Sequence, residues 1–264
     1  MIAQSLAEAW HGQLRDRSGG TMAAEPEAGA AWSGLSLDGS AALLSTVAHE
    51  LRAPLAALVT ASELLVEDFG SLDEQQAFNM VATVHRGSLW LQSLVDNLLC
   101  AATMRDGHFR IRREPMQLLD IVAEIRPVVE PLLKHKNQRL QVSASGPDCN
   151  VAADRRRIGQ VLVNLIVNAG KFAGSGTAVD VRLAARDNGV RVAVMDRGPG
   201  IPEAAARRLF EPFYQVAPDG SSLKGVGLGL AIVKSIVDAH DGRVGVENRR
   251  GGGACFWFDI PTAS

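Results

Sequence analysis

One histidine of the chain, His49, lies among residues that suit it for nucleophilic chemistry: the segment reads Ala48-His-Glu-Leu-Arg-Ala-Pro-Leu55. An imidazole titrates near pH 6.5, so at cytosolic pH its neutral form is a good nucleophile. Glu50 could accept the proton from one ring nitrogen while the other attacks. Pro54 should kink the helix, because it removes the hydrogen bond back to residue 50. The alternative is that His49 is a structural residue of an amphipathic helix.

A second candidate group comprises Asn164, Asn168 and Lys171, within the segment Asn164-Leu-Ile-Val-Asn-Ala-Gly-Lys-Phe172. In a helix, with about 100° per residue, these three side chains fall within roughly 60° of one another. Carboxamide oxygens are suitable ligands for Mg²⁺, and a lysine is a point charge for phosphate oxygens. The stripe therefore suits a metal-bridged phosphate. A solvated polar stripe is the alternative.

The segment Asp196-Arg-Gly-Pro-Gly-Ile-Pro202 follows directly after a predicted strand. A carboxylate at a strand end can accept a hydrogen bond from an exocyclic amine such as adenine N6. The glycines, Gly198 and Gly200, would let a ligand approach the backbone. Alone, this pattern could also be only a turn.

The fourth segment, Gly225-Val-Gly-Leu-Gly-Leu230, leads into a predicted helix. Glycines at every second position before a helix N-terminus can form a cradle of backbone N–H groups for phosphates. The segment lacks both the G-K-[ST] ending of a P-loop and the G-x-G-x-x-G spacing of a dinucleotide fold, which disfavours those two families. Between it and Asp196 lie Leu209–Gln215 and a polar stretch, residues 217–224, that is predicted to be a lid.

The whole chain has 27 Lys and Arg against 29 Asp and Glu, a net charge of −2, which argues against a general nucleic-acid binder. Residues 41–107 hold three basic and eight acidic side chains, whereas residues 108–264 hold 22 and 16. The basic C-terminal part suits a polyphosphate ligand, or is simply a solvated surface. There is no apolar run of about 18 residues and no signal peptide, so we expect a cytoplasmic protein without membrane insertion. Cys100, Cys149 and Cys255 are far apart and are expected to be reduced thiols.

The N-terminal part of the chain is predicted to be helical. Residues 1–37 are expected to be a leader and linker, partly flexible because the stretch is rich in glycine and alanine. From about Asp38, a helix is predicted by leucines spaced by seven, at Leu44, Leu51, Leu58 and Leu65. A turn at Asp68–Asp73 ends it, and a second helix should run to about Arg105. Two helices alone bury too little surface, so residues 38–106 are predicted to form a hairpin that dimerises into a four-helix bundle.

Residues 107–264 mix helix and strand patterns and are predicted to form one α+β sandwich. Helices are expected at Gln117–Lys134, Arg155–Phe172 and Leu228–His240, and strands at Phe109–Arg112, Leu140–Val142, Arg243–Glu247 and Cys255–Ile260. Ala178–Ala185 and Val190–Asp196 are predicted to form a β-hairpin with an Asn188-Gly189 turn. The predicted fold class is therefore α + α/β, a dimeric helical hairpin followed by a sandwich.

In this order, the segments resemble the motifs of the sensor histidine kinases of two-component signalling. The resemblance covers about residues 38–262. The His49 segment resembles the H box, Asn164–Lys171 the N box, Asp196–Pro202 the first glycine box, Phe210-Glu-Pro-Phe213 the F box and Gly225–Leu230 the second glycine box. The resemblance implies a HisKA-type hairpin for dimerisation and phosphotransfer, followed by a Bergerat-type ATP-binding domain of the GHKL superfamily.

The resemblance also implies roles for individual residues, with ATP and Mg²⁺ as cofactors. His49 and Glu50 would be catalytic, Asn168 the Mg²⁺ ligand, and Asp196 the adenine contact. The ATP-binding residues implied are Asn164, Asn168, Lys171, Asp196, Gly198, Gly200, Phe210, Gly225, Gly227, Leu228 and Gly229. The γ-phosphoryl group would pass to His49 and then to an aspartate of a response-regulator receiver domain. The protein would be a homodimer, and its stimulus would come from residues 1–36, a separate sensor protein or an upstream region.

Two positions depart from the family pattern. Ala53 lies four residues after the histidine, where such kinases usually carry Thr or Asn to position the water that dephosphorylates the partner. A methyl group cannot orient water, so we hypothesise weak or absent phosphatase activity. Val226 lies where Thr or Ser is common, and we expect only a modest change in nucleotide affinity, because the backbone N–H groups remain.

Two other functions are compatible with parts of this pattern. A GHKL ATPase of another class, such as the gyrase, chaperone or mismatch-repair type or an anti-sigma serine kinase, would have no use for the His49 segment. A non-catalytic phosphotransfer or scaffold protein would have no use for an intact Asn168, Asp196 and glycine loop.

Overall fold

The computed structural model of the chain describes residues 37–68, 70–146, 149–186, 188–216 and 226–262. The predictions for the leader and linker before residue 37, for the lid at 217–224 and for Gly225 lie outside these residues. Among the helices that the structure describes, none is both long enough and apolar enough to cross a bilayer.

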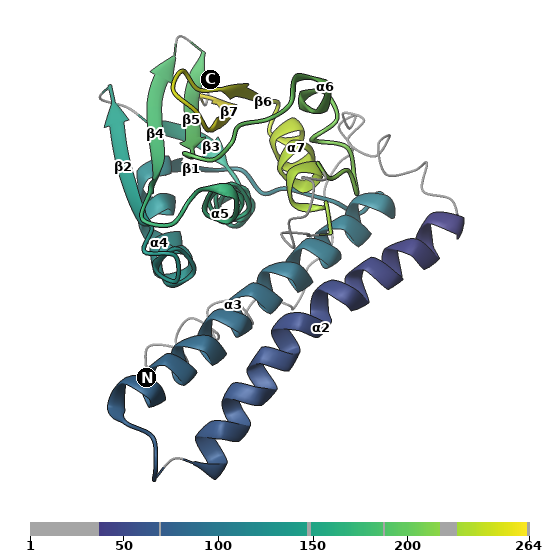
Figure 1. Cartoon of the computed structure of the whole chain (residues 1–264). Coiled ribbons are helices and arrows are strands. Elements are labelled where there is room, and N and C mark those ends of the chain that lie inside the picture. The colour runs from purple at the N-terminus through teal and green to yellow at the C-terminus, as the bar shows by residue number, and fades with distance from the viewer. Residues whose placement is uncertain (1–36, 69, 147–148, 187, 217–225, 263–264) are drawn as a thin grey trace.

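Two long antiparallel helices, α2 (Leu37–Glu67) and α3 (Glu74–Arg105), form the predicted hairpin (Figure 1). Helix α2 is continuous through Pro54. The start of α3 is fixed by a capping box, in which the Asp73 carboxylate accepts the Gln76 N–H at 2.7 Å and the Gln76 side-chain oxygen accepts the Asp73 N–H at 3.0 Å. Local sequence therefore sets where the second helix begins.

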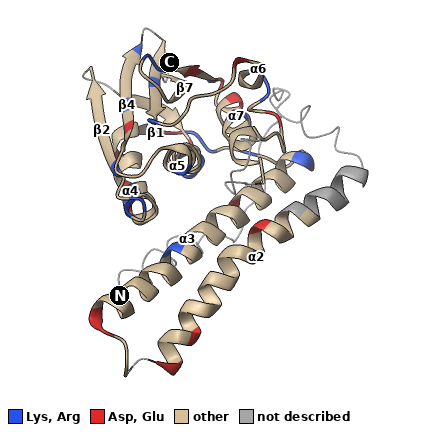
Figure 2. Cartoon of the chain, in the orientation of Figure 1, with Lys and Arg blue, Asp and Glu red and all other residues tan. Residues whose placement is uncertain are grey.

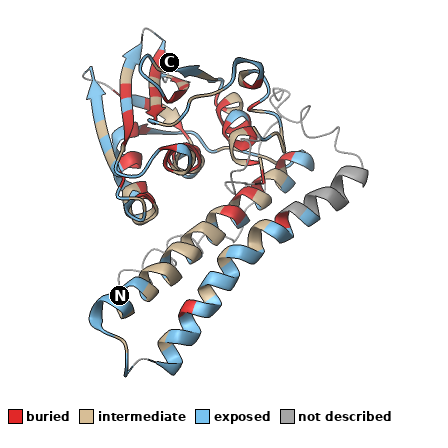
Figure 3. Cartoon of the chain, in the orientation of Figure 1, coloured by how far each residue is buried: buried red, intermediate tan, exposed pale blue. Residues whose placement is uncertain are grey.

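The apolar side chains of the hairpin lie on different faces. On α3, Leu94 and Met104 are buried, whereas Val95 and Leu99 are exposed. Figure 3 shows how much of the hairpin is exposed, and the exposed large apolar side chains on it are Leu55, Val59, Leu64, Val66, Phe78, Val81, Val95 and Leu99. Acidic side chains gather at the end of the hairpin where α2 passes into α3 (Figure 2). A single copy of the hairpin thus leaves a long apolar surface uncovered.

The rest of the described chain is built on a five-stranded sheet in the order β2-β4-β5-β7-β6. The strands are β2 (Arg139–Ser145), β4 (Ala178–Arg186), β5 (Gly189–Met195), β6 (Arg243–Asn248) and β7 (Ala254–Pro261). Strands β2 and β4 are parallel, and the other neighbours are antiparallel. A separate antiparallel pair is formed by β1 (Glu114–Gln117) and β3 (Asn150–Ala153).

Three helices cover one face of the sheet: α4 (Leu118–Lys134), α5 (Arg155–Phe172) and α7 (Gly229–Ala239), as Figure 1 shows. Each presents a buried apolar stripe, and the core between helices and sheet includes the fully buried side chains of Ile121, Ile158, Leu165, Ile236 and Phe258. A single helical turn, α6 (Glu203–Ala206), follows the Asp196 segment. The predicted helical hairpin and α+β sandwich are both confirmed.

The prediction of a strand at Phe109–Arg112 is wrong, because the first strand begins at Glu114. The Phe109 ring instead lies 4.8 Å from the Arg157 guanidinium, and the Arg112 N–H donates to the Asp154 carboxylate at 2.9 Å. Side-chain interactions thus take the place of a strand ladder. Neither β3 nor α6 was predicted, because four residues are too few to give a periodic pattern.

The β4–β5 hairpin is present, but its turn is not centred on Asn188-Gly189. Arg186 pairs with Gly189, so Gly189 belongs to the strand ladder as the first residue of β5. A Cβ at position 189 would overlap the carbonyl oxygen of Ile260 on β7. The glycine is therefore required by the close approach of two strands and not by the turn.

A buried histidine, His240, connects the end of α7 to the start of α5. Its Nε2 accepts the backbone N–H of Asp154 at 2.9 Å, and its Nδ1 lies 2.7 Å from the carbonyl oxygen of Ile236. Both contacts are satisfied by the neutral tautomer that carries its proton on Nδ1. Burial lowers the pKa of His240. The hydrogen bond to the Ile236 carbonyl raises this pKa, but the effect of burial is larger.

This arrangement predicts that acid destabilises the fold. The folded-state pKa of His240 lies below its unfolded value near 6.5, so the unfolded chain binds more protons. The stabilisation is complete above about pH 6.5 and is lost as pH falls, by at most about 1.4 kcal/mol per pH unit for one group. We expect the free energy of unfolding, measured by urea denaturation, to fall less steeply between pH 7.5 and 5.5 in His240→Gln than in the wild type. The exposed His85→Gln should keep the wild-type slope, and equal slopes in all three proteins would refute the assignment.

Candidate active site

The carboxylate of Asp196 lies at the end of β5, and the residue is only 4% exposed. Its Oδ1 accepts two backbone N–H groups, from Gly198 at 2.8 Å and from Ala254 at 3.0 Å. Within the described part of the chain, Oδ2 receives no hydrogen bond. A buried carboxylate oxygen without a donor is costly. The site is therefore suited to a ligand that brings an N–H group.

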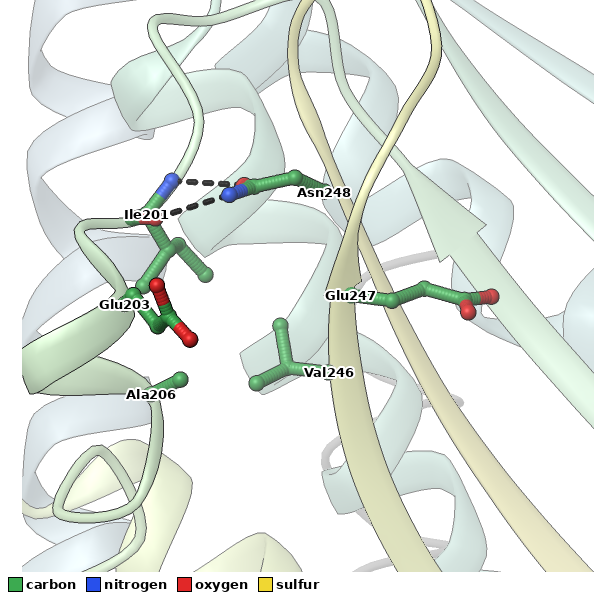
Figure 4. Close-up of a pocket in the computed structure, with 6 residues that line it drawn as sticks. All are labelled: Ile201, Glu203, Ala206, Val246, Glu247 and Asn248. Atoms are coloured by element: carbon green, nitrogen blue, oxygen red, sulfur yellow. Dashed lines mark hydrogen bonds between the residues drawn. The ribbon is translucent and has the colours of Figure 1, made fainter.

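The loop that carries Asp196 is fixed from behind by the end of β6. The Asn248 amide accepts the Ile201 N–H and donates to the Ile201 carbonyl, both at 2.8 Å (Figure 4). The Arg249 guanidinium donates to the carbonyl of Asp196. A hollow of about 210 Å³ beside Asn248 is lined by Ile201, Glu203, Ala206, Val246 and Glu247. This hollow lies behind the loop and includes none of the predicted site residues.

A close approach at Gly198 joins the Asp196 loop to the C-terminal end of α5. A Cβ at position 198 would lie 2.8 Å from the carbonyl oxygen of Phe172 and 3.1 Å from Asp196 Oδ1. Any side chain would push the two segments apart. The second glycine of the loop, Gly200, has a positive φ of 81°. The sequence-predicted stripe on α5 and the predicted adenine contact are thus neighbours in space.

The end of α5 is held by two side chains from the turn after α4. Gln138 donates to the carbonyls of Gly170 and Ala173 at 3.0 and 3.1 Å, and Lys136 donates to the carbonyl of Lys171 at 2.6 Å. These bonds satisfy carbonyls that the last turn of a helix leaves without partners. They fix the direction in which the final turn of α5 presents its side chains.

On that last turn, Asn168 and Lys171 are half-buried. The Asn168 carboxamide has no hydrogen bond within the described residues, so its oxygen is available to a ligand. Burial lowers the pKa of Lys171, whereas the charge of Glu50 on α2 raises it and that of Lys136 lowers it. Glu50 therefore lies within electrostatic reach of the stripe, although the two residues are far apart in the sequence.

The donor set also decides how a cation would be held. The described residues contain no cluster of three or more His, Cys, Asp or Glu side chains that could hold a metal ion. A single carboxamide from Asn168 fits Mg²⁺ only together with ligand oxygens such as those of phosphates, which is how proteins commonly bind this ion. The residues fit a Mg²⁺ that arrives with a nucleotide.

The glycine loop lies against both the Phe210 segment and α5. Gly227 has a φ of 74°, and its carbonyl accepts the Phe213 N–H at 2.9 Å. A Cβ at Gly229 would lie 3.2 Å from Asn164 Oδ1. Helix α7 begins at Gly229, so its first N–H groups are available to an anion. Val226 and Leu228 are buried, and Phe210 packs against the core.

The structure therefore brings together most of the predicted ATP-binding residues, from four separate segments of the chain. His49 lies apart from them on α2, where it is exposed, with Glu50 half-buried and Ala53 exposed. Within the described residues, no hydrogen bond or ion pair joins His49 to the α5 stripe. His49 and the predicted ATP-binding residues thus lie on different structural parts.

Asn97 on α3 is a residue of the site that sequence reasoning missed. It is buried and exchanges two hydrogen bonds with Asn164, at 2.8 and 3.1 Å, and it accepts a third from Gln160 at 3.1 Å. The available signal was a polar side chain within the apolar stripe of α3, between Leu94 and Leu98. Asn164, a predicted phosphate contact, is therefore already hydrogen-bonded to the hairpin.

The site and fold define a nucleotide-binding enzyme in which a glycine-rich loop and a carboxylate-bearing loop flank one helix. Comparison with known families agrees. Residues 153–264 match the family described as histidine kinase-, DNA gyrase B- and HSP90-like ATPase, and residues 40–107 match the His Kinase A (phospho-acceptor) domain. The chain therefore belongs to the histidine kinase family.

Individual relatives support the same assignment. The sensor protein KdpD of Clostridium acetobutylicum is 33% identical over 221 residues, which cover 83% of this chain and 24% of KdpD. The catalytic domain of histidine kinase ThkA is 33% identical with a TM-score of 0.52, covering 58% of this chain and 99% of that one. Full-length ShkA in complex with AMPPNP is 31% identical with a TM-score of 0.57, and the match covers 84% of this chain and 46% of that one. The chain thus spans about a quarter of the KdpD sequence.

A complex provides one more comparison. ThkA in complex with the response regulator protein TrrA is 25% identical to this chain, with a TM-score of 0.55, and the match covers 84% of this chain and 61% of that one.

The free oxygen of Asp196 generates a direct prediction. In Asp196→Asn, Oδ1 can still accept the two backbone N–H groups, but an NH₂ group replaces the acceptor Oδ2. We expect ATP affinity, measured by calorimetry, to fall at least about tenfold, because a ligand amine would then face a donor. The matched control is Asp259→Asn, which changes a carboxylate on β7 that is held by Arg191 of β5. This variant should bind ATP normally. Unchanged ATP affinity in Asp196→Asn would remove Asp196 from the site.

Proposed function

We propose that the protein transfers the γ-phosphoryl group of ATP to His49 and from there to an aspartate of a response regulator. The observation that carries this proposal is the convergence of the Asp196 loop, the α5 stripe and the glycine loop on one another. Three segments with nucleotide-binding chemistry meet through close approaches at Gly198 and Gly229. The exposed His49 supplies a nucleophile on a neighbouring helix.

In this proposal each part of the site holds a different part of ATP. Asp196 Oδ2 accepts a hydrogen bond from the adenine amine, beside Gly198 and Gly200. Lys171 and Asn164 contact the phosphates, and Asn168 holds Mg²⁺, which would neutralise charge on the phosphate oxygens. The N–H groups at the start of α7 and of the glycine loop, Gly225, Gly227 and Gly229, complete the phosphate site, with Phe210 and Leu228 packed behind it.

The transfer itself requires little covalent chemistry from the protein. A ring nitrogen of His49 bonds to the γ-phosphorus while the bond to the β–γ bridging oxygen breaks and ADP leaves. Glu50 accepts the proton from the other ring nitrogen, which keeps the imidazole neutral. Positioned donors stabilise the charge of a loose transition state. The carboxylate of the response regulator then attacks the phosphohistidine and takes over the phosphoryl group.

The hairpin also supplies the surface for a homodimer. Phe78, Val81, Val95 and Leu99 recur along one exposed face of α3, with Leu55 and Val59 exposed on α2. A second hairpin would bury these side chains in a four-helix bundle. The presence of TrrA on the related ThkA supports a response regulator as the partner of this chain.

Labelling with ATP tests the phosphoryl acceptor. We expect wild-type protein to acquire acid-labile, base-stable phosphate, and His49→Ala to lose at least about 99% of it while binding ATP normally, because the nucleophile is absent. Asn168→Ala should lower labelling at least about tenfold and weaken ATP binding in the presence of Mg²⁺. His85→Ala, an exposed histidine on α3, is the control and should label fully. Full labelling of His49→Ala would overturn the proposal.

The phosphatase step has a separate test. Ala53 is exposed one turn after His49, and its methyl group cannot orient a water, so we propose that the protein dephosphorylates its partner poorly. Ala53→Thr should raise the ADP-independent loss of phosphate from the purified phospho-regulator at least about tenfold, because the hydroxyl positions water. Ala57→Thr, one turn further along the same exposed helix, should leave it unchanged. Rapid dephosphorylation by the wild type would contradict the proposal.

A further inference from the structure

One face of α3 is buried against α5 and α7. Its members recur at helical spacing, Leu94, Asn97, Cys100 and Met104, and all are buried. Helix α3 contacts α4 and α7 as well as α5. The polar member, Asn97, is 8% exposed and lies opposite Asn164, which is also 8% exposed. A buried polar residue in an apolar stripe is expected to have a specific partner.

The two asparagines satisfy each other. Asn97 donates through Nδ2 to Asn164 Oδ1 at 2.8 Å, and Asn164 donates through Nδ2 to Asn97 Oδ1 at 3.1 Å. Gln160, one turn before Asn164 on α5, also donates to Asn97 Oδ1, at 3.1 Å. The pair therefore forms a closed ring of two hydrogen bonds between the hairpin and the nucleotide-binding helix.

Asn164 is closed to a further ligand in this arrangement by its burial. A carboxamide has two acceptor sites on its oxygen and two N–H donors, of which Asn97 takes one of each, and the residue is only 8% exposed. The oxygen also lies against Gly229, at 3.2 Å from where a Cβ would be. The residue is walled in by α3 on one side and by the start of α7 on the other.

Charged and polar groups around the asparagines reinforce the contact. The Arg157 guanidinium of α5 donates to Cys100 Sγ at 3.4 Å and to the Gln160 side chain at 3.2 Å. Burial raises the pKa of Asp96, and the charges of Arg156 and Arg157 oppose this shift. The contact is therefore specific in its hydrogen bonds and does not rest on apolar packing alone.

We propose that α3 and the phosphates of ATP compete for the Asn164 carboxamide, so that Asn97 holds the nucleotide-binding part docked on the hairpin until ATP takes its place. This inference rests on the proposed function, in which Asn164 contacts phosphate. In the docked form the nucleotide part is held on α3 by this pair of asparagines. Release of Asn164 frees the nucleotide part to carry ATP to His49.

Competition makes the two events reciprocal. If ATP weakens docking by a given factor, docking weakens ATP binding by the same factor. Loss of Asn97 should therefore increase ATP affinity, whereas a residue that merely oriented Asn164 for phosphate would decrease it. The direction of the change separates the two roles.

Cys100 provides a readout of docking that does not involve ATP chemistry. It is 2% exposed and lies one turn beyond Asn97 against Arg157. We expect iodoacetamide at pH 8 to modify Cys100 slowly in wild-type full chain and roughly tenfold faster with AMPPNP and Mg²⁺. In Asn97→Ala the modification should be fast without nucleotide, since the three hydrogen bonds of the Asn97 side chain are lost. Cys255, buried at 8% exposure on β7, should stay protected in every case, which excludes general unfolding.

ATP affinity completes the test. Asn97→Ala should bind ATP several-fold more tightly than wild type. Asn79→Ala changes an exposed asparagine on the same helix whose side chain, within the described residues, hydrogen-bonds only to Gln75, and it should match wild type in both assays. Asn97→Asp, which keeps the shape but loses the donor, should behave like Asn97→Ala. Weaker ATP binding in both Asn97 variants, or protection of Cys100 that AMPPNP does not change, would overturn the competition.

Asn164→Ala separates failure of this inference from failure of the proposed function. It should expose Cys100 to alkylation and should bind ATP more weakly than Asn97→Ala, which is also undocked but keeps Asn164. If it exposes Cys100 but binds ATP as tightly as Asn97→Ala, the phosphate contact of Asn164 is wrong and the competition fails with it. If Cys100 stays protected, Asn164 does not hold the docked form. ATP-dependent labelling of His49 tests the proposed function separately, and its outcome does not depend on either of these results.

Discussion

The arrangement of the site depends on one buried carboxylate that needs backbone donors. Asp196 can be buried only if Oδ1 receives N–H groups, and these come from Gly198, two residues later, and from Ala254 on the neighbouring strand. This requirement bends the chain back at the end of β5 and ties it to β7. The bend in turn brings Gly198 against the end of α5. The end of β5, the turn after it and the end of α5 are thus positioned by the burial of the Asp196 carboxylate and by the two N–H groups that compensate for its lost hydration.

Helix α5 serves two purposes with different parts of one polar face. Asn168 and Lys171 lie on its last turns, and the Phe172 carbonyl at its end lies against the Asp196 loop, whereas Gln160 and Asn164 hydrogen-bond to α3. Both groups lie on the side of the helix that is not packed on the sheet. Residues four apart on a helix are neighbours. Asn164, which bonds to α3, therefore lies next to Asn168 on the surface of α5. The opposite face, with Ile158 and Leu165, anchors the helix in the core.

Sequence patterns predicted the long elements well, because amphipathic helices and alternating strands carry strong periodic signals. Helix α5 was predicted at its observed bounds, and Asp154 caps it through the Arg157 N–H. Patterns failed where tertiary contacts decide the structure. Phe109–Arg112 has the pattern of a strand, but the Phe109 ring packs on Arg157 and the Arg112 N–H donates to Asp154. Gly189 looks like a turn residue but is required by β7. Asn97 was missed because its partner is 67 positions away, and no local pattern records such a contact.

The backbone bond between Phe213 and Gly227 has a consequence for how this protein can vary. The Phe213 N–H donates to the Gly227 carbonyl at 2.9 Å, which fixes the two ends of the intervening segment at one point beside α7. The closure entropy of a segment with fixed ends grows only slowly with its length, by about 0.6 kcal/mol on doubling. Insertions between these two residues would therefore leave the sheet, α5 and α7 almost as stable as before. Length in this segment is free to diverge between related chains in a way that the tightly packed Asp196 loop does not permit.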